Sequence, residues 1–316
     1  GARISAGSGL DSSSVSLNAL SSELEASLAL YADIVRNPAF READIERIRG
    51  QWLADIAQEK TQPTGVALRT LPPLLYGDQH AYGIPFTGSG TEASIKSLDV
   101  KDLRRFHREF IRPDNLKILI AGDTTLAEIT RQLDKVFGDW QATETPVPVK
   151  AIANVDAPTK ARVFLIDRPD SPQSLILTGS LAPSTTVANN IEIQTMNGIF
   201  GGTFTSRLNM NLREDKRWAY GASSFLQDAI GQRPFMTYAS VQTDKTAESA
   251  AEVLKEARAV IGDKPITDEE IARIKAQRIR ALPGSFETTG SVLGILSGNA
   301  LYSRPDDYVQ TLKARL

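Results

Sequence analysis

The sequence has no cysteine and only two histidines. The absence of cysteine excludes disulfide bonds, thiolate metal sites and cysteine nucleophiles. The two histidines, His80 and His107, lie far apart, and neither a His-x-x-x-His nor a His-x-x-Glu-His spacing occurs. Because a catalytic zinc ion needs three protein ligands, these two side chains do not make a zinc site. We expect His80 on a loop and His107 on a charged helix, both as ordinary polar residues.

Strong net charge and long apolar runs are also missing. The net charge is −2, and no dense basic segment is present, so the sequence does not indicate a nucleic-acid partner. No apolar stretch approaches the roughly 20 residues that a membrane span needs. With 316 residues, 41% of them hydrophobic and 23% charged, the chain has the composition of a soluble globular protein with room for two domains.

An internal repeat is the most informative feature that is present. Residues 40–76 resemble residues 266–302 at a constant offset of 226 residues, without a gap. A period this long indicates duplicated domains, because solenoid repeats are much shorter. The identical pairs in the first matched helix are Ile45 and Ile271, Arg47 and Arg273, Ile48 and Ile274, and Gln51 and Gln277.

The repeat predicts a fold class and a domain division. The expected units are residues 1–145 and 161–316, joined by a proline-containing linker at 146–160. By extrapolation, the first unit lacks about 70 opening residues and the second lacks about 50 closing residues, so the chain is expected to be a fragment. Runs of strands followed by runs of helices predict an α+β fold of duplicated α/β sandwich units, with helices packed on a mostly antiparallel sheet.

Hydrophobic periodicity and turn signals locate the individual elements. Thr125-x-x-Glu128 is predicted to form a capping box at one helix start. The Thr87-Gly88-Ser89-Gly90-Thr91 segment lacks the lysine of a phosphate-binding loop and is predicted to be a turn. Strands are expected within 2–20 and at 116–121, 161–166, 173–180, 220–226 and 235–241; helices are expected at 22–35, 42–58, 63–75, 100–110, 186–200, 205–214, 246–261, 267–281 and 286–301.

Two segments of the second unit are candidates for a functional site. Gly201-Gly202 is expected to make a tight turn between helices, with Thr205 or Ser206 capping the second one. Further on, Arg213 ends a predicted helix and Tyr220 begins a predicted strand. A guanidinium and a phenol brought together there could bind a substrate carbonyl or carboxylate. The alternative is structural: Arg213 pairs with a surface carboxylate and Tyr220 packs at a sheet edge.

Several motifs resemble those of the pitrilysin/insulinase superfamily of zinc metallopeptidases, the inverzincins. The resemblance spans most of the chain, and its most specific part is the separation of seven residues between Arg213 and Tyr220. The matching segments are Asn37-Pro38-Ala39-Phe40, the aromatic loop from Tyr76 to Gly83, Gly201-Gly202 with Ser206-Arg207-Leu208, and Leu212-Arg213 with Ala219-Tyr220-Gly221.

The resemblance implies a role for the Arg/Tyr pair. In this family, an inverted His-x-x-Glu-His helix and a later Glu bind zinc in one half of the enzyme, and an Arg/Tyr pair comes from the opposite half or from a partner chain. Carried over, Arg213 would orient the peptide and Tyr220 would hydrogen-bond the developing oxyanion. The third-ligand position aligns near Asp55, and the expected helix 189–200 carries no histidine.

We therefore expect the non-catalytic half of a zinc endopeptidase. We expect this chain to hold no cofactor of its own, with zinc bound in an upstream or partner catalytic half. Its expected partners are that half and a peptide substrate. The alternative is a catalytically dead assembly subunit of a larger complex. The resemblance to long bacterial members implies a periplasmic location.

Overall fold

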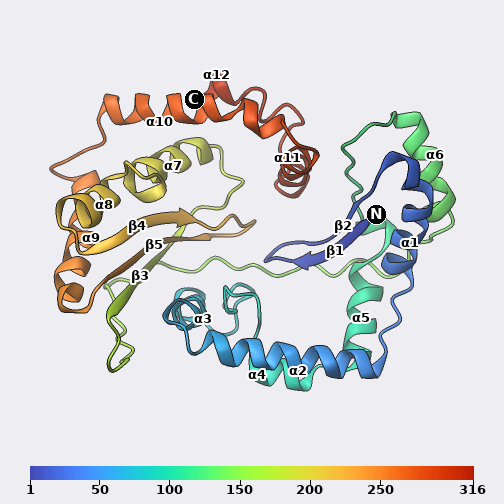
Figure 1. Ribbon diagram of the computed structural model, residues 1–316, viewed down its shortest axis with the longest axis horizontal. Helices are drawn as coiled ribbons and strands as arrows, with labels where there is room; N and C mark the ends of the chain where they lie inside the picture. Colours follow the sequence, from blue (N-terminus) through green and yellow to red (C-terminus); the bar gives the residue numbers. More distant parts are fainter. The chain divides into compact units, whose positions relative to one another are not determined.

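The computed structural model describes all 316 residues as a mixture of helices and small antiparallel sheets, which confirms the α+β class (Figure 1). The strands are β1 (Arg3–Ser8), β2 (Ser13–Asn18), β3 (Gln173–Ala182), β4 (Ala219–Leu226) and β5 (Arg233–Gln242). The α-helices are α1 (Leu24–Arg36), α2 (Glu42–Glu59), α3 (Pro63–Tyr76), α4 (Glu92–Ser97), α5 (Val100–Phe110), α6 (Leu126–Phe137), α7 (Asn190–Asn197), α8 (Arg207–Asn209), α9 (Thr246–Ile261), α10 (Asp268–Ala281), α11 (Thr289–Leu301) and α12 (Leu312–Arg315).

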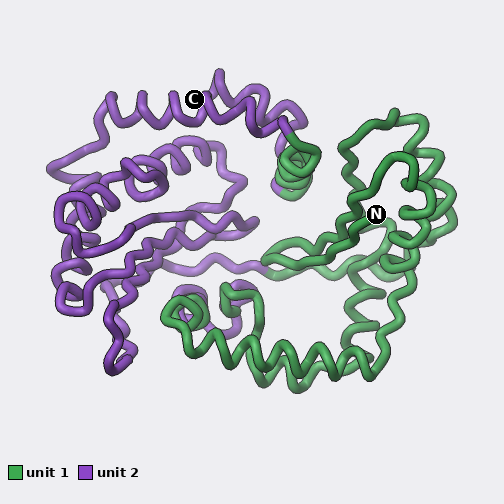
Figure 2. The backbone as a smooth tube through the Cα atoms, in the orientation of Figure 1, with its two compact units in different colours: residues 1–69, 84–151, 288–301 green, residues 70–83, 152–287, 302–316 purple.

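The chain forms two compact units, neither of which is continuous in sequence (Figure 2). Unit 1 contains Gly1–Arg69, Ile84–Ala151 and Thr288–Leu301, and unit 2 contains Thr70–Gly83, Ile152–Glu287 and Tyr302–Leu316. Each unit therefore includes one segment from the other half of the sequence. The predicted units 1–145 and 161–316 were inferred from the sequence repeat. The compact units are defined by contacts in space and do not test that repeat, so the predicted division stays a prediction.

Helix boundaries repeat at the offset that the sequence showed. Helix α2 begins at Glu42 and α10 at Asp268, while α3 begins at Pro63 and α11 at Thr289. Both pairs are separated by 226 residues. On this basis we propose that the two halves are copies of one ancestral unit.

Unit 1 places a two-stranded sheet beside a pair of helices. β1 and β2 pair in antiparallel register from Arg3 with Asn18 to Ser8 with Ser13. The Tyr31 hydroxyl on α1 donates to the carbonyl of Val15 on β2 at 2.9 Å. The same ring packs edge-to-face on Phe137 of α6, so one aromatic side chain joins the hairpin to both helices.

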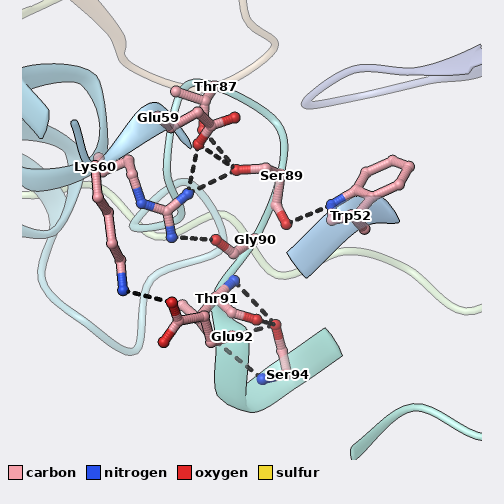
Figure 3. A network of polar contacts seen from close by, with 10 residues as sticks. Trp52, Glu59, Lys60, Thr87, Ser89, Gly90, Thr91, Glu92 and Ser94 are labelled. Carbon is pink, nitrogen blue, oxygen red and sulfur yellow. Dashed lines mark hydrogen bonds and ion pairs between the residues drawn. The ribbon is translucent and has the colours of Figure 1, made fainter. Parts of the chain in front are cut away.

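A polar network fixes the Thr87–Thr91 turn of unit 1 (Figure 3). The Ser89 hydroxyl donates to Glu59 at 2.8 Å, and Arg69 donates to the same carboxylate at 2.7 Å. The indole of Trp52 donates to the Ser89 carbonyl at 2.8 Å. Partial burial alone would raise the pKa of Glu59, but the hydrogen bonds from Ser89, Arg69 and Thr87 together lower it. The segment is a turn, as predicted, and it is held by side chains of α2 and α3.

Unit 2 packs helices on one face of a three-stranded sheet with the strand order β3-β5-β4. Both strand pairs are antiparallel, and Thr237 of β5 lies between Thr178 of β3 and Ser224 of β4. The buried core between sheet and helices consists of Phe200, Leu208, Leu212, Ala222, Ala239, Val241 and Val253. Burial of these apolar side chains is the main contribution that holds the sheet against the helices.

Two predicted strands are absent. Residues 116–121 and 161–166 are irregular, because neither segment forms a hydrogen-bonded ladder with a neighbouring strand. A short apolar run shows that a segment can form a strand, but the strand exists only where a partner lies beside it. Val163 and Leu165 are consequently about nine-tenths exposed, at 93% and 89%.

Two predicted caps also differ from the structure. Thr125 caps α6 by accepting from the Glu128 backbone, but the reciprocal bond of a capping box is not formed. Ser206 occupies the cap position of α8 without a side-chain cap bond, and its buried hydroxyl makes no hydrogen bond. The full capping box in unit 2 joins Thr267 and Glu270 at the start of α10.

Glu270 also anchors helix α8 to helix α10. Arg207 donates from Nε and Nη2 to the two carboxylate oxygens of Glu270, each at 2.6 Å. Arg207 Nη2 donates as well to the carbonyl of Pro265 at 2.9 Å. The hydrogen bonds from Arg207 lower the pKa of Glu270 to about 2, which outweighs the opposing effect of burial.

In the Glu270→Gln protein, the free energy of unfolding should change less between neutral and acid pH than it does in the wild type. Because the folded pKa of Glu270 lies below the unfolded one, its contribution is complete above about pH 4.3 and is lost as the pH falls toward about 2. We expect that contribution to be about 2 kcal/mol after allowance for solvent screening. Urea unfolding of both proteins at about pH 6 and about pH 2.5 measures it.

Glu25→Gln is the matched control, because Glu25 forms an exposed ion pair with Lys135 that water screens. If both variants reduce the pH dependence of the free energy of unfolding equally, the Arg207–Glu270 pair has no special role.

Candidate functional site

The predicted Arg/Tyr pair is brought together by a tight connection between a helical turn and strand β4. Residues Met210–Asp215 form a π-helical turn, η4, whose Leu212 side chain is fully buried in the core of unit 2. The Trp218 backbone donates to the Leu212 carbonyl at 3.0 Å, which closes the connection. Arg217 completes the turn with a φ of +58°, a left-handed conformation that is uncommon for a residue with a side chain. The chain thus reverses within three residues and starts β4.

A β-bulge directs Tyr220 away from the sheet. Ala219 pairs with Val241 and Ala222 pairs with Ala239, so three steps on β4 match two on β5. The extra residue disturbs the alternation of side chains at Tyr220 and Gly221. As a result, Tyr220 is 84% exposed while the neighbouring Ala222 is buried.

The guanidinium of Arg213 lies against two aromatic rings. Its Cζ atom is 4.8 Å from the centroid of Phe204 and 5.3 Å from that of Tyr220. Arg213 Nε also forms an ion pair with Glu214 at 3.2 Å. Cation–π contacts at exposed sites are worth about 0.5–1 kcal/mol, enough to favour one side-chain position. The structure therefore brings both sequence-predicted residues together, and their role in substrate binding stays a prediction.

The Gly201-Gly202 pair lets a second π-helical turn approach β4 closely. This turn, η3 (Gly198–Gly202), places Gly201 so that a Cβ atom would lie 2.5 Å from Ser224 Oγ and 2.6 Å from the Ser224 backbone nitrogen. No real Cβ is found so close to backbone atoms. The Ser224 hydroxyl donates to Asn197 Oδ1 at 2.7 Å within the same contact. Glycine is required here by close packing, and the predicted tight turn between helices is a π-helical segment.

Asn209 was not singled out by sequence reasoning, although it fixes both sides of the site. Its Nδ2 donates to the Phe204 carbonyl at 2.7 Å, and its Oδ1 accepts from the Ala222 backbone at 3.1 Å. The side chain is buried, with 4% of its surface exposed. Asn209 thereby holds the Phe204 segment at a set distance from β4. A lone Asn between two apolar residues gives no signal of this contact in the sequence.

A groove opens beside the Arg/Tyr pair. Its volume is about 740 Å³, and it is lined by residues of η3, the following segment, helix α8, and strands β3, β4 and β5. Six of the lining side chains are Gln173, Phe204, Tyr220, Ser223, Tyr238 and Ser240. This volume is in the range of about 300–1,000 Å³ typical of small-molecule sites. The exposed face of Tyr220 therefore borders a hollow large enough to hold part of a peptide.

The residues present do not fit a zinc ion. His80 uses both ring nitrogens, one accepting from the Tyr82 backbone at 2.9 Å and the other 2.9 Å from the Ala153 carbonyl. His107 Nε2 lies 2.7 Å from the Val35 carbonyl, and Asp55 is exposed on α2. No group of three or more His, Cys, Asp or Glu side chains is arranged to hold a metal ion.

None of the helices combines the length and apolar character that crossing a bilayer requires.

Comparison with known sequences connects this chain to zinc proteases. Residues 97–278 match the family model described as the peptidase M16 inactive domain. An uncharacterized zinc protease of Mycobacterium leprae is 24% identical over 287 residues, which cover 90% of this chain and 61% of that protein. The chain thus spans about three fifths of the length of that relative.

Comparison with solved structures finds the same fold. The crystal structure of a peptidase M16 inactive domain from Pseudomonas fluorescens superposes with a TM-score of 0.89 at 23% identity, covering 99% of this chain and 74% of that one. The first half of the periplasmic protease PqqL from Escherichia coli gives a TM-score of 0.69 at 15% identity, covering 99% and 69%.

Gly201→Ala should destabilise unit 2 by about 1–3 kcal/mol, because the added methyl group collides with β4 backbone atoms that cannot turn away. The free energy of unfolding in urea measures this effect. Gly50→Ala is the control: no atom lies within 4 Å of its added Cβ in helix α2, so we expect a gain of about 0.5–1 kcal/mol. Equal effects in the two variants would rule out the close-contact explanation.

Proposed function

The chain belongs to the family of the peptidase M16 inactive domain, and from this premise we propose that it serves as the non-catalytic half of a zinc endopeptidase. In this proposal it supplies a substrate-binding wall to a catalytic half that lies in the same chain or in a partner subunit. Zinc and the general base belong to that catalytic half, where the metal supplies Lewis-acid chemistry to peptide hydrolysis.

The observation that carries the proposal is the meeting of Arg213 and Tyr220 at the rim of the groove. Tyr220 is exposed, so its hydroxyl is free to approach a bound peptide. A phenol donates a hydrogen bond to a carbonyl oxygen, and the bond strengthens as that oxygen becomes negative. The Arg213 guanidinium carries donors in a planar fork, which suits a peptide carbonyl or a terminal carboxylate.

The rings of Phe204 and Tyr220 hold the guanidinium before substrate arrives. A charged side chain fixed in this way loses less conformational entropy on binding than a mobile one. The bulge at Tyr220 and the buried Leu212 hold the backbone of both residues. The pair is therefore preorganised by these ring contacts and by the backbone of the connection.

A structural role is the alternative. The ion pair between Arg213 and Glu214 supports it, because a guanidinium paired with its neighbour needs no substrate. In that case the chain is an assembly subunit of a larger complex without a part in proteolysis.

We also propose a periplasmic location, based on the resemblance to long bacterial members of the superfamily. Fractionation of cells that express the complete gene tests it, and recovery of the protein with the cytoplasmic fraction would overturn it.

The 316-residue chain alone should bind no equimolar zinc and hydrolyse no peptide. The physical reason is ligand count, since both histidines are engaged with the backbone and no third ligand lies near them. The test is elemental analysis after a chelator wash and reloading with zinc, together with a peptidase assay. Tightly held stoichiometric zinc with measurable activity would refute the proposal.

Tyr220→Phe should lower kcat of the complete peptidase by about 10²–10³-fold with a smaller effect on KM, because the lost donor acts mainly in the transition state. Arg213→Ala should also weaken substrate binding by about 1.5–3 kcal/mol, because a charged hydrogen bond acts in the ground state too. Steady-state kinetics on one peptide separates these effects.

Arg217→Ala is the matched control for Arg213→Ala, since it removes an exposed guanidinium from the same connection. Unchanged turnover in Tyr220→Phe would favour the assembly role. Loss of the fold in Arg213→Ala would show that the arginine is structural.

A further inference from the structure

The lining of the groove differs in charge from the rim on which Arg213 lies. None of the residues that line the groove is an Asp, Glu, Lys or Arg. The lining contains three aromatic rings, those of Phe204, Tyr220 and Tyr238, together with small residues and side-chain amides and hydroxyls. A hollow of this composition offers apolar surface and neutral hydrogen-bonding groups, but no counter-ion.

The rings stand on three different segments around the hollow. Tyr238 lies on β5 and is the register partner of Ser223 on β4, so these two side chains are on the same face of the sheet. Tyr220 comes from the bulge of β4, and Phe204 comes from the segment after η3. Phe204 is held there by Asn209, which binds its carbonyl. The backbone of each ring-bearing residue is therefore held by the sheet or by Asn209.

We propose that this groove binds one uncharged side chain of a peptide substrate, with an aromatic side chain preferred over a basic one. The inference rests on the proposed function, because it assigns the neighbour of the Arg/Tyr pair as the site that selects the substrate. An aromatic side chain would pack against the rings of Phe204, Tyr220 and Tyr238 in the edge or offset geometries that aromatic pairs prefer.

A basic side chain meets two obstacles. An ammonium group that enters the groove gives up part of its hydration, and no carboxylate among the lining residues replaces it. The guanidinium of Arg213, lying against the rings of Phe204 and Tyr220, adds repulsion of the same sign, which its ion pair with Glu214 reduces. Rejection of a charge that the site cannot pair is a strong source of selectivity, because the unpaired group is costly to desolvate.

The test measures binding of small probes to the 316-residue chain and needs no hydrolysis. The probes are the N-acetyl amides of phenylalanine, norleucine and lysine, titrated in NMR experiments. Norleucine and lysine have nearly the same shape, so their difference reports the ammonium charge. We expect phenylalanine to bind at least about tenfold more tightly than lysine, with norleucine between them.

Ser223→Asp supplies the missing counter-ion. Ser223 lines the groove and is exposed, so the substitution should leave the fold intact. We expect lysine binding to improve at least about fivefold and phenylalanine binding to change little. Ser223→Asn is the matched control, since its side chain has the shape of aspartate without the charge, and it should leave lysine binding weak. Phe204→Leu should weaken phenylalanine binding while norleucine binding is largely retained.

Several outcomes would overturn the proposal. These are equal affinities for phenylalanine and lysine, no saturable binding of any probe, and a folded Ser223→Asp protein with unchanged lysine binding. Failure of the proposed function is a separate result: unchanged turnover in Tyr220→Phe removes the role of the Arg/Tyr pair without altering the affinities of these probes.

Discussion

The arrangement of unit 2 depends on the close approach of the Gly201-Gly202 turn to strand β4. A single methyl group at position 201 would overlap the Ser224 backbone, so the helical layer can reach the strand only with glycine there. The segment that carries Phe204, whose ring meets Arg213, follows this turn directly in the chain. The buried Asn209 side chain then bridges the segment to β4 with one hydrogen bond on each side.

Sequence reasoning located most helices because the information is local. The start of α10 is encoded by Thr267 and Glu270, which cap each other over three residues. The strand expected at 161–166 failed for the opposite reason. Its run of apolar residues suits a buried strand, but pairing depends on what lies beside the segment, and no pattern within it records that. The same limit applies to Ser206, whose position suits a cap although its buried hydroxyl makes no cap bond.

The site was predictable in part. The spacing of Arg213 and Tyr220 came from the sequence through a family resemblance, and the structure places the two side chains together. Phe204 and the bulge at Tyr220 could not be inferred, because a bulge is a mismatch between two strands and a ring–guanidinium contact joins separate segments. Local patterns identify which residues are unusual, whereas tertiary packing decides which of them meet.

The exchange of segments between the two compact units has a consequence for synthesis of the chain. Unit 1 includes residues Thr288–Leu301, although its other parts are complete by Ala151. At roughly 5–20 residues per second, the ribosome needs on the order of 10 seconds to make the intervening stretch. During that interval, the nascent first unit lacks the Thr288–Leu301 segment, which contains helix α11. Unit 1 can therefore be completed only after sequence near the far end of the chain has been made.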